Sequence, residues 1–201
     1  MKKVGVLLSG RGSNLQALVD AARRGELGGE IAVVVSNVEG ALGLERASQA
    51  GIPTVFRDNR GKAREAFDAE IVEILRAHHV DLVCLAGFMR LVSPVFVRAF
   101  PGRIVNIHPA LLPAFPGLDA QRQAWEHGAK VSGATVHLVD EGLDSGPIVA
   151  QEAVSVLSGD TAQTLADRIL EAEHRLYPRA VRILLDGRYH IEGRRLTVEG
   201  Q

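Results

Sequence analysis

The chain has 201 residues, of which 46% are hydrophobic and 23% charged, the balance of an ordinary globular domain. This composition excludes an intrinsically disordered chain. Its 23 basic and 24 acidic residues leave a formal charge of −1, so nothing electrostatic points to nucleic acid or an anionic membrane as a partner. Any anionic ligand must therefore be held by a local arrangement of groups.

The single cysteine, Cys84, excludes an intrachain disulfide and favours a reducing compartment. It lies in the apolar run Leu82–Ala86, where a buried structural thiol is expected. The apolar run that follows the two N-terminal lysines is too short for a signal peptide, and no stretch is long enough to span a bilayer. The expected location is the cytoplasm.

Short apolar runs alternate with helical patterns through the first half of the chain. Buried strands are predicted over residues 4–9, 31–36, 53–56, 81–86 and 104–107. Helices are predicted from residue 14 onward and over residues 41–50, 62–79 and 94–100. Such alternation predicts a mostly parallel sheet with helices on both faces.

The second half predicts an antiparallel pair of strands at the sheet's edge, over residues 131–139 and 148–156. A helix follows from Thr161, and Pro178 is expected to kink or restart it before it ends near Leu185. Residues 189–198 resemble a small hairpin. With no repeat or linker, the chain is predicted to be one mixed α/β domain over residues 1–201.

The first strand ends in the glycine-rich segment Ser9–Asn14, directly before a helix. Glycines allow a close backbone approach, and the free N–H groups of a helix start favour an anion. Simple helix capping is the alternative. Leu15 replaces the third glycine of a dinucleotide fingerprint, the second strand ends in Ser36-Asn37 without an acid, and no G-K-[ST] is present. A single phosphate suits the loop better than a dinucleotide or a triphosphate.

Asn106 and His108 lie two residues apart at the end of a predicted strand, so both point to the same side. Pro109, Pro113 and Pro116 predict a stiff, non-helical segment after them. An amide donor beside an imidazole suits acyl transfer, because the amide stabilises an oxyanion and the imidazole handles a proton. Lone histidines elsewhere are expected to be structural: His78, His79, His127 and His190.

The loop over residues 140–147 joins the last two predicted strands and carries three acids. One carboxylate near His108 would favour the cationic imidazole, but Asp140, Glu141 and Asp144 are equal candidates on the residues alone. No H-E-x-x-H or C-x-x-C motif is present, so no metal is expected. The missing G-x-S-x-G elbow argues against a serine hydrolase.

Four motifs stand in the order and spacing of one known family: Ser9-Gly10-x-Gly12-Ser13-Asn14, Leu85-Ala86-Gly87-Phe88-Met89-Arg90, Asn106-Ile107-His108-Pro109-x-Leu111-Leu112-Pro113 and Leu143-Asp144-x-Gly146-Pro147. The chain closely resembles the phosphoribosylglycinamide formyltransferases, the folate-dependent enzymes of purine synthesis, over essentially its whole length. The resemblance implies a Rossmann-like sheet. Ala110 departs from the serine that is frequent in the family.

The resemblance also implies roles for individual residues. Asn106, His108 and Asp144 would be the catalytic trio, which selects Asp144 from the three acids. The substrate's phosphate and ribose would be bound by Gly12, Ser13, Asn14 and Glu173. The folate pocket would be lined by Asn106 and by residues of three further segments: Arg64, Met89, Arg90, Leu91, Val92, Asp140, Glu141, Gly142, Leu143 and Asp144.

The implied reaction moves the formyl group of 10-formyltetrahydrofolate, a co-substrate, to the amine of glycinamide ribonucleotide. Residues 1–100 would form the nucleotide-substrate half and residues 101–201 the catalytic and folate half of a monomer or homodimer. The alternatives are a 10-formyltetrahydrofolate hydrolase and a non-catalytic folate or sugar-phosphate binding module. The neutral charge and the chain's end at residue 201 argue against a tRNA formyltransferase, and its early first strand argues against the hydrolase.

Overall fold

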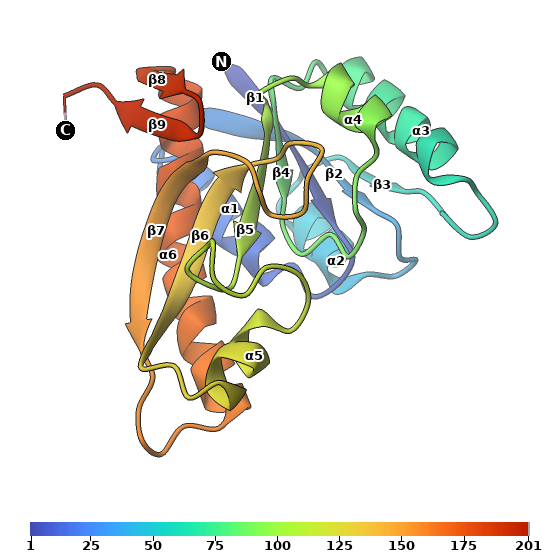
Figure 1. The fold of residues 1–201 in the computed structure, drawn as a ribbon. Coiled ribbons are helices and arrows are strands. Elements are labelled where there is room, and N and C mark those ends of the chain that lie inside the picture. The colour runs from blue at the N-terminus through green and yellow to red at the C-terminus, as the bar shows by residue number, and fades with distance from the viewer. Residues whose placement is uncertain (201) are drawn as a thin grey trace.

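The computed structural model describes residues 1–200, which form a single sheet of nine strands (Figure 1). In chain order the strands are β1 (Lys2–Leu8), β2 (Gly29–Ser36), β3 (Thr54–Phe56), β4 (Leu82–Leu85), β5 (Ile104–His108), β6 (Val131–Leu138), β7 (Ile148–Ser155), β8 (Tyr189–Glu192) and β9 (Arg195–Val198). Their order across the sheet is β3-β2-β1-β4-β5-β6-β7-β9-β8. The first five strands are parallel, whereas β6 runs antiparallel to both β5 and β7.

Helices cover both faces of this sheet, as the alternation of the sequence predicts (Figure 1). They are α1 (Ser13–Arg23), α2 (Leu42–Gln49), α3 (Arg64–Ala77), α4 (Pro94–Ala99), α5 (Ala120–Glu126) and α6 (Ala162–Asp186). Side chains of α1, α2 and α6 pack into the core on one face, while those of α3 and α4 pack into the core on the other. The predicted α/β class with an antiparallel pair is confirmed.

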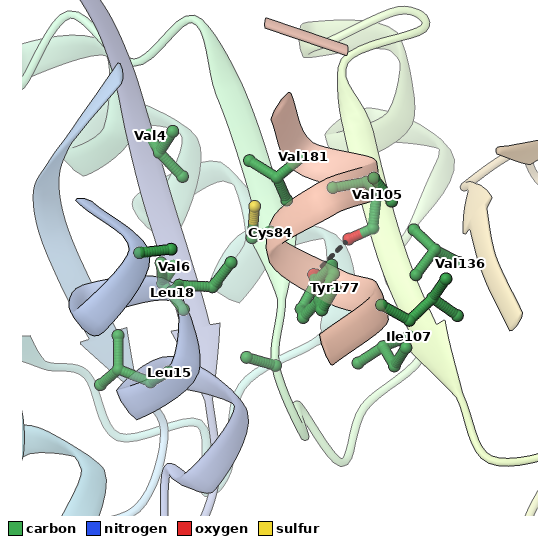
Figure 2. Packing of buried hydrophobic residues seen from close by; sticks show 14 of the residues in the cluster. Val4, Val6, Leu15, Leu18, Cys84, Val105, Ile107, Val136, Tyr177 and Val181 are labelled. Carbon is green, nitrogen blue, oxygen red and sulfur yellow. Dashed lines mark hydrogen bonds between the residues drawn. The ribbon is translucent and has the colours of Figure 1, made fainter. Parts of the chain in front are cut away.

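Strand alternation divides the buried residues between the two cores. In β4, Leu82 and Cys84 face the core under α1 and α6, while Val83 and Leu85 face the core under α3 and α4. Figure 2 shows Tyr177 of α6 inserted over β4 and β5 among aliphatic side chains. Its buried hydroxyl lies 2.9 Å from the Leu85 carbonyl and 3.1 Å from the Val105 carbonyl.

The expectation that Pro178 restarts the last helix is wrong, because α6 runs unbroken over Ala162–Asp186 with Pro178 inside it. Its apolar face is buried on both sides of the proline, with Leu165 and Ile169 before it and Val181 after it, and this packing outweighs the lost backbone hydrogen bond. At its start, Thr161 and Thr164 form the reciprocal hydrogen bonds of a capping box.

Helix α5 is the element that the sequence does not predict. It is short, and only Ala120 and Ala124 are buried, so the sequence has no apolar periodicity that would predict it. The other elements lie within about two residues of their predicted limits. The hairpin of β8 and β9 is confirmed, and it extends the sheet beyond β7 through a parallel bridge between Ile148 and Arg195.

The topology brings the predicted motifs to one edge of the sheet. The chain leaves β1 toward β2 and β3 on one side, then crosses to β4 and β5 on the other, so the order reverses between β1 and β4. In open α/β sheets, ligands bind outside the carboxyl ends of the strands at such a point. None of the helices within residues 1–200 is both long and apolar enough to cross a bilayer.

Candidate active site

The loop after β1 has the geometry of an anion cradle. Gly12 occupies the N-cap position of α1 in a left-handed conformation (φ 70°), and no side chain caps the helix. The helix start therefore keeps free N–H groups in its first turn, which carry the positive end of the helix dipole. The alternative that Ser13 or Asn14 merely caps the helix is not what the structure contains.

The side chain of Asn14 instead reaches across to α6. Its amide donates a 2.8 Å hydrogen bond to the carboxyl group of Glu173, and both residues are buried. Burial raises the pKa of Glu173 to about 7, although the Asn14 hydrogen bond acts in the opposite direction. The fold thus joins two predicted substrate-binding residues that lie 159 positions apart in the chain.

A hollow of about 410 Å³ opens next to this loop, lined by Ser13, Gln16, Arg46 and His174 among others. It is bordered by α1, α2 and α6, and its lining includes the cationic Arg24 and Arg46, the acidic Asp20 and neutral polar groups. Two residues that line the hollow, Ser13 and His174, directly neighbour Asn14 and Glu173 in the sequence. Space for a small polar ligand is therefore available beside the cradle.

The second cluster lies at the end of β5, where Asn106, His108 and Asp144 come together. Asn106 and His108 project from the same side of β5. The His108 Nδ1 atom lies 3.5 Å from a carboxylate oxygen of Asp144, which comes from the loop between β6 and β7. Both side chains are largely buried, with exposed fractions of 5% and 12%.

A further histidine, His137, belongs to this cluster and is missed by the sequence analysis. It pairs directly with Asn106 across β5 and β6, and its Nε2 atom lies 3.3 Å from the Asn106 amide nitrogen and 3.6 Å from Asp144. Alternation along the predicted strand 131–139 fixes only its side. The β5–β6 register, which the sequence does not reveal, makes it a neighbour of Asn106.

The ring of His108 faces oxygen acceptors on both sides. Its Nε2 atom lies 2.8 Å from the backbone carbonyl of Phe115, and its Nδ1 atom faces the Asp144 carboxylate. Because these oxygens only accept hydrogen bonds, a ring that satisfies both must carry a hydrogen on each nitrogen. The structure thus places both ring nitrogens of His108 beside oxygen atoms, one of them in a carboxylate.

Asp144 is held as an anion by several neighbours. Burial alone would raise its pKa, but His137, a 2.8 Å hydrogen bond from the Gly117 N–H and the charge of His108 together bring the pKa below its ordinary value. Asp144 also adopts a left-handed backbone conformation (φ 47°), which is uncommon outside glycine and tends to occur at functional sites.

The three acids of this loop have different surroundings. The carboxylate of Asp140 accepts hydrogen bonds from the Gly142 N–H (3.0 Å) and the Ser145 hydroxyl (2.6 Å), so it shapes the loop itself. Glu141 is exposed. Of the three candidate acids, Asp144 is the one that contacts His108, and its selection through the family resemblance agrees with the geometry.

The predicted folate segment after β4 lies beside the anion cradle. The hydroxyl of Ser9 accepts a hydrogen bond from the Met89 N–H (2.9 Å) and donates one to Asn37 (2.6 Å). The residues Met89, Leu91 and Leu143 are 70%, 60% and 53% exposed. Both loops therefore present apolar side chains to solvent.

Two predicted folate residues are connected to α3. Arg90 stacks over Phe67, with its guanidinium carbon 4.9 Å from the ring centre, and its buried Nε atom has no hydrogen-bond partner within residues 1–200. Arg64 is the first residue of α3 and is exposed. No hydrogen bond or ion pair in the described part of the chain joins Arg64 to the other predicted residues.

Other reactive side chains lie outside the cluster. His78 and His127 each contact a backbone carbonyl at 2.9 Å, in keeping with structural roles. Burial raises the pKa of the Cys84 thiol to about 12. Across residues 1–200, no group of three or more His, Cys, Asp and Glu side chains is arranged to hold a metal ion.

Comparison with known proteins gives a consistent result. The family model described as formyl transferase matches residues 2–181. A phosphoribosylglycinamide formyltransferase of Escherichia coli (strain K12) is 43% identical over 197 residues, covering 98% of this chain and 93% of the relative. The trifunctional purine biosynthetic protein adenosine-3 of Drosophila melanogaster is 53% identical over 189 residues. That match covers 92% of this chain, which spans only 14% of the longer protein.

Solved structures agree with these relatives. Glycinamide ribonucleotide transformylase 1 from Symbiobacterium toebii superposes with a TM-score of 0.97 and 56% identity, over 98% of this chain and 94% of the other. A formyltetrahydrofolate deformylase from Pseudomonas syringae has a TM-score of 0.91 and 30% identity, over 98% of this chain and 65% of the other. The same fold therefore occurs in proteins named for transfer and for removal of a formyl group.

Proposed function

The chain belongs to the formyl transferase family, and from this we propose that it transfers the formyl group of 10-formyltetrahydrofolate to the amine of glycinamide ribonucleotide. The products are formylglycinamide ribonucleotide and tetrahydrofolate. The observation that carries the proposal is the meeting of Asn106, His108 and Asp144 at the carboxyl edge of the sheet. The family resemblance gives these three residues the catalytic roles.

The reaction joins the substrate nitrogen to the formyl carbon and breaks the bond between that carbon and the folate nitrogen. As the carbon becomes tetrahedral, negative charge develops on the formyl oxygen. The Asn106 amide and the cationic ring of His108 stabilise this charge. Asp144 stabilises the charge on His108, and a water beside Asp144 relays the amine's proton to the departing folate nitrogen. No covalent bond to the protein is required.

The glycine-rich cradle supports binding of the substrate's phosphate by Gly12, Ser13 and Asn14. Glu173 accepts hydrogen bonds from the ribose hydroxyls in this proposal. Its hydrogen bond with Asn14 supports the assignment, because it links the phosphate loop to the ribose partner at a fixed distance of 2.8 Å.

For the formyl donor, the exposed apolar side chains of Met89, Leu91 and Leu143 fit the flat ring system of a folate. The buried, unpartnered Nε atom of Arg90 offers a donor to a polar group of the ligand. Val92, residues 140–144 and Arg64 complete the proposed pocket. The division into a nucleotide half (1–100) and a catalytic and folate half (101–201) belongs to the same proposal, as does a cytoplasmic location.

Release of the formyl group to water is the alternative reaction, because a deformylase shares this fold at 30% identity. A direct assay separates the two reactions. The protein is incubated with 10-formyltetrahydrofolate, with and without glycinamide ribonucleotide, and both tetrahydrofolate and formate are followed. Transfer predicts folate turnover only with the ribonucleotide and no formate. Formate release without the ribonucleotide would establish the hydrolase, and binding without turnover would leave a binding module.

The catalytic roles are tested with Asn106→Ala and His108→Ala, and with His78→Ala as the matched control. Loss of one oxyanion donor lowers kcat by roughly 10²- to 10³-fold. His78 lies at the end of α3, where its ring contacts the Ile74 carbonyl, so its replacement leaves turnover unchanged. Unimpaired turnover of Asn106→Ala would rule out the proposed role of the amide.

A further inference from the structure

The start of α2 is pressed against the glycine-rich loop that follows β1. A Cβ atom placed on Gly12 would lie 2.5 Å from the Cα atom of Gly43, and one placed on Gly43 would lie 3.2 Å from the Cα atom of Gly12. The side chain of Leu8 closes the other side of Gly43, at 2.5 Å from such a Cβ. The two backbones therefore touch at a contact where neither residue can carry a side chain without a shift.

Hydrogen bonds join the same two segments on both sides of this contact. The Gly43 N–H donates to the Gly10 carbonyl at 3.0 Å, and the Arg46 Nε–H donates to the Arg11 carbonyl at 3.0 Å. The guanidinium of Arg46 then reaches Gln16 of α1 at 3.5 Å. Three successive residues of the loop, Gly10 to Gly12, are thus held by α2.

The loop has few other means of keeping its shape. No side chain caps α1, the side chain of Arg11 is exposed, and Gly10 and Gly12 have no side chains to pack. Glycine-rich backbone loses the most conformational freedom when it is ordered. A loop that binds phosphate through backbone N–H groups must be ordered before the ligand arrives, since otherwise the ordering weakens binding.

We propose that Arg46 and Gly43 of α2 are positioning residues for the substrate's phosphate. Arg46 holds the Arg11 carbonyl, and the Gly12–Gly43 contact fixes the turn, so that the N–H groups at the start of α1 converge on the phosphate. This inference deepens the proposed function, on which it rests for the identity of the phosphate ligand. Neither residue touches the reacting atoms.

The test compares Arg46→Ala, Arg46→Gln and wild type in calorimetric binding of glycinamide ribonucleotide and of the riboside that lacks the phosphate. The Arg46→Gln variant retains an N–H donor near the position of the arginine Nε atom but not the charge. We expect Arg46→Ala to bind the ribonucleotide about tenfold more weakly and Arg46→Gln to bind within about threefold of wild type, as for loss and retention of one hydrogen bond to a bound loop. Binding of the riboside is expected to change less than about twofold in both variants.

Steady-state kinetics add a second readout. The KM for the ribonucleotide is expected to rise in Arg46→Ala, with kcat and the KM for the folate within about twofold of wild type. The matched control is Arg76→Ala, an arginine of α3 paired with Glu73 on the opposite face of the sheet. Gly43→Ala is expected to reproduce the phosphate-specific loss. If that variant does not fold, the comparison of Arg46→Ala with Arg46→Gln still tests the inference, because Arg46 is only partly buried.

The inference would be overturned if Arg46→Ala lost affinity equally for the ribonucleotide and the riboside. It would also be overturned if Arg46→Ala and Arg46→Gln lost affinity for the ribonucleotide equally, because the effect would then belong to the charge of Arg46. If wild type binds the ribonucleotide but transfers no formyl group to it, the proposed function fails while the binding comparison still decides the role of Arg46. If wild type does not bind the ribonucleotide, both fall.

Discussion

Asn106 and His137 face each other across β5 and β6, with the amide nitrogen of the first 3.3 Å from the ring Nε2 of the second. The other ring nitrogen of His137 lies 3.0 Å from the Leu138 carbonyl, to which it must donate. The Nε2 atom of His137 is therefore the one that faces both the Asn106 amide and the Asp144 carboxylate. This contact holds the Asn106 side chain in place beside the cluster.

His137→Ala should therefore lower kcat by freeing the Asn106 amide to rotate. We expect a loss of about tenfold, smaller than the loss on removing Asn106 itself. The KM values should stay within about twofold, because His137 is not in the proposed binding contacts. Steady-state kinetics check this, with His190→Ala in the exposed hairpin as the control. A kcat equal to that of wild type would contradict the positioning role.

In the proposed function, Glu173 should make substrate binding depend on pH. Because burial raises its pKa to about 7, the carboxyl group is mostly protonated at pH 6 and mostly ionised at pH 8. If the ribose hydroxyls require the carboxylate, the Kd for glycinamide ribonucleotide should fall about tenfold between these values, in proportion to the competent fraction. Calorimetry measures this change. The Kd of Glu173→Gln should still change with any titration of the substrate's phosphate. The tenfold change that comes from Glu173 should be absent.

The same carboxyl group should limit the stability of the ligand-free protein. A raised pKa in the folded state means that the native protein binds more protons than the unfolded chain, so stability falls as pH rises from about 4.5 to about 7. Glu173→Gln should be more stable than wild type above pH 7, by up to about 3 kcal/mol, and equal to it near pH 4. Urea unfolding at the two pH values tests this. A constant difference between the proteins would contradict it.

Thr135 supports the stiff segment that follows His108. Its buried hydroxyl donates to the Ala110 carbonyl at 2.6 Å and accepts from the Leu112 N–H at 3.0 Å. Thr135→Val keeps the shape but leaves both backbone groups unpaired. The free energy of unfolding should fall by about 1–3 kcal/mol. The exposed Thr197→Val serves as the control and should change it by less than about 0.5 kcal/mol.

Cys84 should behave as an inert core thiol. It is fully buried, and burial raises its pKa to about 12. A thiol reagent at pH 8 should therefore label the native protein at the rate of unfolding and the denatured protein within seconds. Cys84→Ala should retain kcat. A fast reaction of the native protein would show that the core around β4 opens.

The sequence predicts most of this fold because its strands are apolar runs separated by clear breaks. It fails where tertiary packing decides the outcome. Pro178 normally interrupts a helix, yet burial of α6 on both sides of it keeps the helix continuous. Helix α5 exposes all of its side chains except two alanines and two partly buried residues, so no pattern marks it.

Some residues of the candidate site are likewise predictable from the sequence, and others are not. Asn106 and His108 are predictable from their own strand, since alternation puts both on one side. His137 and the Asn14–Glu173 bond depend on the register of β5 with β6 and on the placement of α6 against α1, which arise only from long-range packing. The proposed phosphate loop can be recognised in the sequence by its glycines. Its contact with Gly43 and Arg46 cannot be predicted from the sequence.

Tyr177 sits one helical turn after Glu173, and its hydroxyl touches the carbonyls of Leu85 and Val105. Leu85 leads into the proposed folate segment, and Val105 precedes Asn106 in the chain. One side chain therefore links α6, where the proposed ribose partner lies, to the ends of β4 and β5, which lead to the proposed donor segment and to Asn106. These bonds fix the spacing of the two proposed binding sites, and a movement of the loops over residues 87–92 and 140–146 would leave that spacing unchanged.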